Sequence, residues 1–184
     1  MNHLMVDLET LDTQPGGVIL SIGAVMFDPT KPVSDCLGDE FYYVVGIPTC
    51  EALGMTTSPD TLAWWEKQSP EARAVLEQAR SPAESISIAK ALDRFTLFFP
   101  KGTKVWSNGA NFDQPLIDVA YNRLGKKVPW EYYHSRCHRT VVALHPNEKA
   151  IRPPKVLAHN ALEDAKWQAR HLVGVAQDLG ITLR

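Results

Sequence analysis

Acidic residues at the ends of three separate segments constrain the fold of this chain more than any other feature. Asp7 and Glu9 end one apolar run, Asp113 closes a second, and Asp164 follows His159 near the start of a helical segment. Four carboxylates gathered in one cleft repel one another, and each is pushed toward its neutral form. Hard divalent ions such as Mg²⁺ or Mn²⁺ offset such charge by binding all-oxygen sites. A fold that joins the three segments therefore predicts a metal site.

Length and composition place the chain among ordinary globular proteins. Its 184 residues are enough for one domain, residues 1–184, with a substantial core. Its apolar fraction of 45% is ordinary, and no apolar run approaches the ~20 residues of a membrane span. The first residues lack the pattern of a secretory signal. Three cysteines without close metal-ligand spacing favour free thiols and a cytoplasmic location.

The net charge limits how much nucleic acid the chain can hold. The formal value is −2, whereas a protein that grips a long duplex is usually basic. An enzyme that holds a few nucleotides needs only a local basic patch. Bound metal ions would add positive charge that the formal count omits.

The first quarter of the chain has the composition of β-strands. Residues 4–6, 18–27 and 40–45 predict three strands, and the turn residues between them predict an antiparallel meander. Residues 104–107 predict a fourth strand. A short fifth strand is expected between Trp130 and Cys137.

Helix signals follow the meander. Ser58-Pro59, Ser69-Pro70 and Ser81-Pro82 each combine an N-cap residue with proline at the first helical position, and Glu84 completes a capping box with Ser81. Apolar residues at helical spacing follow this box, namely Ile88, Leu92, Phe95 and Phe99.

Further helices are expected after Asp113 with a stop at Gly125, over residues 140–144, and over residues 161–179. A three-strand meander followed by helices that alternate with further strands is typical of an α/β fold. We therefore expect a mixed sheet, with an antiparallel meander plus parallel strands, flanked by helices.

Each acidic motif has a structural interpretation beside the functional one. Asp7 and Glu9 are two apart on a strand, so they share a face, but they could simply face solvent. Asp113 precedes a helix and could be its N-cap. Asn160 and Glu163 have capping-box spacing, which leaves His159 on a loop and Asp164 in the first helical turn.

Together and in this order, the motifs resemble those of the DEDDh group of 3′–5′ exonucleases, which have a ribonuclease H-like fold. The matching patterns are Asp-x-Glu at Asp7, Asn-x-x-Asn-Phe-Asp from Asn108 to Asp113, and His-x-Ala-x-x-Asp from His159 to Asp164. The resemblance covers nearly the whole chain.

A narrower resemblance involves the segment from Leu62 to Arg73, which contains Trp64 and Trp65. It is similar to a segment of the phage T4 exonuclease A family and of the related exodeoxyribonuclease VIII-like group of small bacterial and prophage exonucleases. One branch of that wider family is described as exoribonucleases. The chain departs from many DEDDh enzymes after Thr10, where Leu11-Asp12 replaces Thr-Gly.

The resemblance implies a role for each motif residue. It makes Asp7, Glu9, Asp113 and Asp164 the ligands of two divalent ions, Mg²⁺ or Mn²⁺, and His159 the general base. Two such ions suit an in-line displacement at phosphorus, and imidazole is suited to proton transfer near neutral pH. Nucleoside 5′-monophosphates would leave the 3′ end. A homodimer is also implied.

Several residues are candidates for contact with the nucleic acid. Trp64 and Trp65 point about 100° apart if helical, so one can pack in the core while the other meets solvent or a base; both could instead lie in the core or an interface. Phe112 could wedge against the terminal base. By analogy with the family, Asn108, Leu8 and Thr10 are also candidates.

Arg139 is the last candidate. It lies with Arg136 and His138 in a basic loop that could bind phosphates or could simply be solvated.

The expected function is a 3′–5′ exonuclease on single-stranded DNA or a short 3′ overhang. One alternative is the same reaction on RNA, which would require contacts to the 2′-OH. A non-catalytic binding module is a second alternative, although binding alone would not need His159. A phosphodiesterase of small nucleotides is a third, which the tryptophan pair and the basic loop disfavour.

Overall fold

The computed structural model describes residues 1–154 and 159–184. Their strands form one five-stranded sheet in the order β3-β2-β1-β4-β5. β1 (His3–Thr10), β2 (Ile19–Phe27) and β3 (Leu37–Val44) form the expected antiparallel meander. β4 (Lys104–Ser107) and β5 (Ser135–Cys137) continue the sheet parallel to β1. The predicted mixed α/β fold is confirmed, and β1 includes Asp7 and Glu9, as their expected place on one strand requires.

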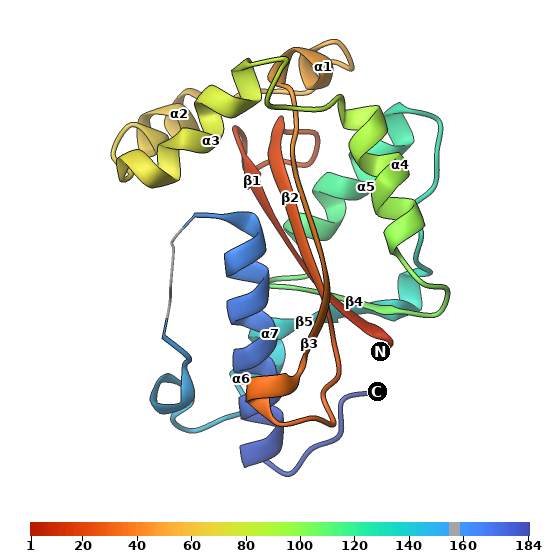
Figure 1. Ribbon diagram of the computed structural model, residues 1–184, viewed down its shortest axis with the longest axis vertical. Helices are drawn as coiled ribbons and strands as arrows, with labels where there is room; N and C mark the ends of the chain where they lie inside the picture. Colours follow the sequence, from red (N-terminus) through yellow and green to blue (C-terminus); the bar gives the residue numbers. More distant parts are fainter. Residues whose placement is uncertain (155–158) are drawn as a thin grey trace.

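Helices cover both faces of this sheet (Figure 1). In Figure 1, α7 (Ala161–Asp178) lies against one face, and α4 (Ile88–Phe98) and α5 (Asp113–Arg123) lie on the other side. The other helices are α1 (Ile47–Glu51), α2 (Pro59–Trp65), α3 (Pro70–Arg80) and α6 (His138–Val142), with short 3-10 turns at Val33–Asp35, Tyr132–His134 and Glu148–Ile151. None of the helices in the described ranges combines the length and the apolar character of a membrane span.

Two of the three Ser-Pro signals start helices, and the third does not. Ser58 and Ser69 precede α2 and α3, and the Ser69 hydroxyl accepts the N–H of Ala72 at 3.2 Å. Ser81 instead follows the end of α3. The prediction of a helix start at Ser81 was wrong. The chain makes one turn at residues 82–84 and goes no further, because Ile86 donates its N–H to Val44 at the end of β3. α4 therefore begins at Ile88, with Ser87 as its cap.

Alternation along β1 separates two cores. Leu4, Val6 and Leu8 point into a core shared with α4 and α5. Met5 points into a smaller core shared with α7. Because side chains two apart share a face of the sheet, Asp7 and Glu9 face the same side as Met5, which is the side of α7.

The start of α7 rests directly on β2. Gly23 is the register partner of Asp7 across β1 and β2. A Cβ atom at Gly23 would lie only 2.1 Å from the carbonyl carbon of Ala161, so only glycine permits this approach. Gly23 thereby brings the first turn of α7 beside Asp7.

The three cysteines are free thiols, as the sequence predicted.

Candidate active site

Four carboxylates come together from three elements. Asp7 and Glu9 lie on β1, Asp113 in the first turn of α5, and Asp164 in the first turn of α7. The N–H of Leu8 donates to Asp113 Oδ1 at 3.1 Å, which fixes the start of α5 against β1. The N-cap of α5 is Phe112, so Asp113 is not the cap that the structural interpretation proposed.

His159 lies just before α7 and faces this cluster. Its backbone N–H donates to Asp164 Oδ2 at 3.0 Å. Potential metal-ligand atoms of Glu9, His159 and Asp164 lie within 4.8 Å of one another. The imidazole also meets Trp64 edge-on, with ring centroids 4.8 Å apart. Asn160 caps α7 as predicted, since its side chain accepts the N–H of Glu163 at 3.1 Å.

Burial disfavours the ionised form of two of the carboxyls, and for Asp7 the neighbouring carboxylate charges add to it. Burial raises the pKa of Asp113 to about 7, although the Leu8 N–H opposes the change. Burial and the charges of Asp113, Glu9 and Asp164 raise the pKa of Asp7 well above its ordinary value. A cluster of this kind binds hard cations, because each bound cation relieves the repulsion. The donor set therefore fits divalent metal ions.

Two cavities that share lining residues bring together the motif residues and most of the substrate-contact candidates that the sequence singled out. The first, of about 330 Å³, is lined by Asp7, Leu8, Glu9, Thr10, Trp64, Trp65, Asn108, Phe112, His159 and Asp164, among others. The second, of about 550 Å³, shares Asp7, Leu8, Asn108 and Phe112 with the first and adds Asp113 and Arg139. The segments that the motifs occupy thus converge on one cleft.

The tryptophan pair divides its roles. Trp65 is 1% exposed and donates its Nε1–H to the carbonyl of Thr10 at 2.9 Å. Trp64 is 41% exposed and packs edge-on against Trp65. The expectation of one core and one exposed indole is confirmed.

The three basic residues that the sequence analysis expected in a loop lie instead on β5 and at the start of α6. Of the three, Arg139 alone lines these two cavities. Its guanidinium donates to the carbonyl of Asn108 at 3.1 Å. His138 is buried, with its Nδ1 at 3.2 Å from Asn108 Oδ1. Arg136 donates to the carbonyl oxygens of Tyr133 and Arg184. Arg136 and His138 line neither cavity and their side chains are engaged within the protein, so Arg139 is the one of the three that stays a candidate for phosphate contact in this cleft.

Three further residues line the first cavity without having been predicted, namely Thr13, Trp167 and Gln168. Thr13 belongs to the loop that departs from the usual DEDDh pattern. Gln168 follows Asp164 by four residues on α7, and this helical spacing was a signal that could have identified it.

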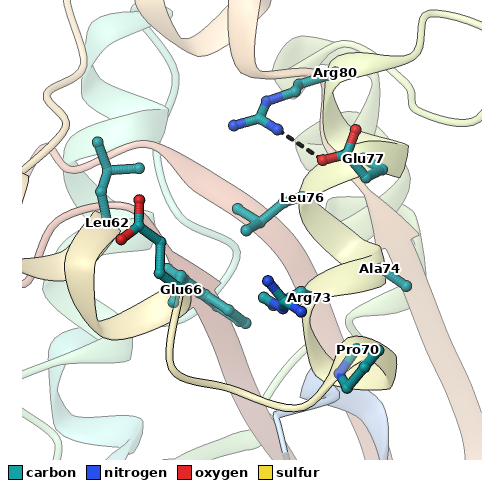
Figure 2. Close-up of a pocket in the computed structure, with 9 residues that line it drawn as sticks. Leu62, Glu66, Pro70, Arg73, Ala74, Leu76, Glu77 and Arg80 are labelled. Atoms are coloured by element: carbon teal, nitrogen blue, oxygen red, sulfur yellow. Dashed lines mark hydrogen bonds and ion pairs between the residues drawn. The ribbon is translucent and has the colours of Figure 1, made fainter.

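Another cavity, of about 520 Å³, lies between α2 and α3 (Figure 2). Figure 2 shows Arg73 beside it and Arg80 paired with Glu77. The distance from Arg80 Nη1 to Glu77 Oε1 is 2.7 Å. Trp65 lines this cavity as well as the acidic cleft. None of the four clustered carboxylates lines it, so the acidic cleft is the candidate active site.

Comparison with known proteins agrees with this geometry. A family model described as the 3′–5′ exoribonuclease Rv2179c-like domain matches residues 2–175. No curated protein matches the chain.

Solved structures share the fold over nearly the whole chain. Exonuclease X in complex with 5′ overhanging duplex DNA is 18% identical with a TM-score of 0.59, covering 97% of this chain and 93% of that one. The nuclease domain of 3′hExo, a DEDDh family member bound to rAMP, is 15% identical with a TM-score of 0.61, covering 98% and 94%. Cell-death related nuclease 4 is 12% identical with a TM-score of 0.53, covering 96% and 64%.

These likenesses confirm the ribonuclease H-like fold. The chain therefore belongs to the family of the 3′–5′ exoribonuclease Rv2179c-like domain, and it is a 3′–5′ exonuclease with the fold of the DEDDh nucleases.

Proposed function

We propose that this exonuclease removes nucleoside 5′-monophosphates one at a time from the 3′ end of single-stranded RNA. The convergence of four carboxylates and His159 on one cleft is the observation that carries the proposal. The family description names exoribonucleases, which favours RNA over the single-stranded DNA expected from the motifs. DNA remains the second candidate, because Exonuclease X was solved with DNA on the same fold.

In this proposal Asp7, Glu9, Asp113 and Asp164 hold two divalent ions, Mg²⁺ or Mn²⁺. When bound, these cations offset the carboxylate charge and stabilise the negative charge that develops on the phosphate oxygens. The raised pKa values of Asp7 and Asp113 support this role. Burial raises both, and neighbouring carboxylate charges raise that of Asp7 further, so a bound cation would favour the ionised forms.

His159 acts as the general base of the reaction. It takes a proton from the water that attacks the scissile phosphorus, as the water oxygen forms its new bond to phosphorus. The bond from phosphorus to the 3′ oxygen of the preceding nucleotide breaks, and that oxygen gains a proton to become the new 3′-hydroxyl. The contact between the imidazole and Trp64 supports the role by limiting how the ring can turn.

The substrate contacts in the proposal follow from exposure. Trp64 stacks on a base near the 3′ end, because its indole is partly exposed beside the acids. Phe112 and Asn108 border the terminal nucleotide, and Arg139 contacts a phosphate. Leu8 and Thr10 line the cleft. However, the Leu8 N–H already donates to Asp113, and the Thr10 carbonyl already accepts a hydrogen bond from Trp65. Their part is therefore mainly to shape the cleft.

The test uses 5′-labelled single-stranded RNA and DNA of the same sequence. Each is incubated with Mg²⁺, with Mn²⁺ or with chelator, beside an Asp7→Ala variant. A metal-dependent ladder that shrinks from the 3′ end, is faster on RNA and is absent in the variant supports the proposal. A faster ladder on DNA would replace RNA with the second candidate.

Intact labels from a folded, metal-bound protein would contradict the proposal. They would favour a binding module or an enzyme for small nucleotides. Oligomers of increasing length separate these two, because a nucleotide-sized pocket gains nothing from added residues.

Three finer points also belong to the proposal. Residues 1–184 act as a single exonuclease domain, and the chain groups with the T4 exonuclease A and exodeoxyribonuclease VIII-like enzymes, which the similarity of the segment around Trp64 and Trp65 supports. The homodimer implied by the resemblance stays a prediction, which sedimentation velocity would test.

A further inference from the structure

Gln168 joins the helix that carries Asp164 to the strand that carries Asp7. It lies one turn after Asp164 on α7 and is 4% exposed. Its Nε2–H donates to Asp7 Oδ1 at 2.7 Å, a short bond between residues 161 positions apart in the sequence. Gln168 also lines the acidic cleft.

The chemistry of this donor suits a carboxylate that must stay free to bind a cation. Asp7 is surrounded by the charges of Asp113, Glu9 and Asp164. A hydrogen bond from a neutral amide favours the ionised carboxylate. It does so without adding a positive charge, whereas a lysine or arginine at this place would compete with a metal ion for Asp7.

The other end of the amide points to the same conclusion. The Oε1 atom of Gln168 is buried and has no hydrogen-bond partner among the described residues. Buried acceptors without a partner are rare in proteins unless another role requires them. The bond to Asp7 therefore explains why a glutamine occupies this position.

We propose that Gln168 is a positioning residue that fixes Asp7 Oδ1 and so holds the Asp7 carboxylate in the orientation that binds a divalent ion. The proposal rests on the proposed function, which makes Asp7 a metal ligand. It assigns to Gln168 a role that acts through Asp7 and not through the substrate.

Two substitutions remove the contact in different ways. Gln168→Met keeps the length but has no donor, and Gln168→Asn keeps the amide but is too short to reach Asp7. Mn²⁺ affinity, measured by isothermal titration, should fall about 10- to 100-fold in both, as for other partners of metal ligands. At limiting Mn²⁺, kcat should fall with little change in the KM for RNA, and excess Mn²⁺ should restore it.

Gln177→Met is the matched control. Gln177 lies on the same helix and donates its Nε2–H to the carbonyl of Lys31 at 2.7 Å, away from the acids. Its loss should change thermal stability slightly and leave Mn²⁺ affinity and kcat as in the wild type.

Wild-type Mn²⁺ affinity in a folded Gln168→Met or Gln168→Asn protein would overturn the proposal. A loss of activity that excess Mn²⁺ does not restore would also overturn it. If Gln168→Met does not fold, Gln168→Asn carries the same test. Failure of the proposed function looks different, because Asp7→Ala would then bind Mn²⁺ as tightly as the wild type.

Discussion

His159 has a backbone conformation that non-glycine residues seldom adopt. Its φ is 61°, the only positive value at a non-glycine position in the described ranges. Histidine and asparagine tolerate this left-handed region better than most residues. Here it is held by the bond from the His159 N–H to Asp164. The backbone of His159 is thus tied to one of the carboxylates that its side chain faces.

A substitution at His159 distinguishes the role of general base from the role of metal ligand. Asparagine suits the same backbone but cannot take up a proton at neutral pH, so His159→Asn should lower kcat about 10²- to 10⁴-fold. Mn²⁺ affinity by isothermal titration should stay within a few-fold of the wild type, whereas Asp7→Ala should lose it. Equal loss of Mn²⁺ binding in both variants would defeat the assignment of His159 as the base.

His3 makes the fold sensitive to acid. Trp106 Nε1–H donates to His3 Nδ1 at 3.0 Å, which requires a neutral ring. Burial, aided by the charges of Lys104 and Arg136, lowers the pKa of His3 to about 4. In the unfolded chain the imidazole takes up a proton near pH ~6.5. Between these values the unfolded state binds more protons, so the free energy of unfolding falls as the pH drops from ~6.5 toward 4.

The variant His3→Asn keeps an acceptor for Trp106 but does not titrate. Urea unfolding at pH 7 and pH 4.5 should show that the wild type loses on the order of 2–3 kcal/mol more stability than the variant. An equal loss in both proteins would mean that His3 does not cause the acid sensitivity.

The site residues that belong to short sequence motifs could be predicted from the sequence. Asp7, Glu9, Asp113, His159 and Asp164 were all identified from short patterns, and the structure brings them to one cleft. Gly23 was not identified, because its role depends on a contact with Ala161 far along the chain. For Gln168 the spacing from Asp164 on α7 was a usable signal, but the bond to Asp7 was not visible in it. The same holds for His138, whose burial against Asn108 no local pattern reveals.

At the level of elements, the contact between β2 and α7 positions the site. Lys166 also joins α7 to the sheet, at β3. Its ammonium lies 3.0 Å from Glu40 on β3 and 3.0 Å from Glu163 on its own helix. The close approach at Gly23 then sets how far the first turn of α7 lies from β1.

A methyl group at Gly23 should push α7 away from the sheet. Gly23→Ala is expected to cost about 1–3 kcal/mol of stability through overpacking. It should also lower kcat and Mn²⁺ affinity, because Asp164 and His159 move with the helix. Thermal unfolding and Mn²⁺ titration measure both effects.

Gly174→Ala is the control for this prediction. Gly174 lies on the same helix, and a Cβ there would meet only ordinary contacts, the nearest at 3.7 Å. Alanine should raise stability by about 0.5–1 kcal/mol through helix propensity. If Gly23→Ala behaves like Gly174→Ala, the close approach does not position the site.

Element boundaries were predictable where the signal was local. Ser69 caps α3 and Asn160 caps α7 through their own side chains, so the sequence was sufficient. The expected start at Ser81 failed because a bond to β3 outweighed the local capping box. α1 was not predicted at all, and it is only five residues long.

At the scale of the molecule, the net charge of −2 limits electrostatic binding. Arg139 is the arginine that lines the acidic cleft, so we expect one or two phosphates to be contacted. For single strands, each phosphate contact contributes about −0.7 to the slope of log affinity against log salt. The slope for single-stranded RNA should therefore lie between about −0.7 and −1.4.

Fluorescence anisotropy with chelator present would measure this slope. Arg139→Gln should make the slope shallower by about 0.7. A slope several times steeper, unchanged in Arg139→Gln, would show that the nucleic acid follows a different basic surface.

The fold class was predictable because the order of strands and helices is encoded in local patterns that repeat along the chain. The three-strand meander and the fourth strand, Lys104–Ser107, followed from composition and turn residues. The packing of α7 against β2 was not predictable from the sequence, because it depends on the absence of a side chain at Gly23.

Anomalous diffraction from a crystal grown with Mn²⁺ and a nucleoside 5′-monophosphate would show whether Asp7, Glu9, Asp113 and Asp164 jointly hold divalent ions. We expect two anomalous peaks among these four carboxylates, with the phosphate beside them and His159 facing it. Peaks elsewhere, or none among the carboxylates at saturating Mn²⁺, would mean that this cluster is not the metal site.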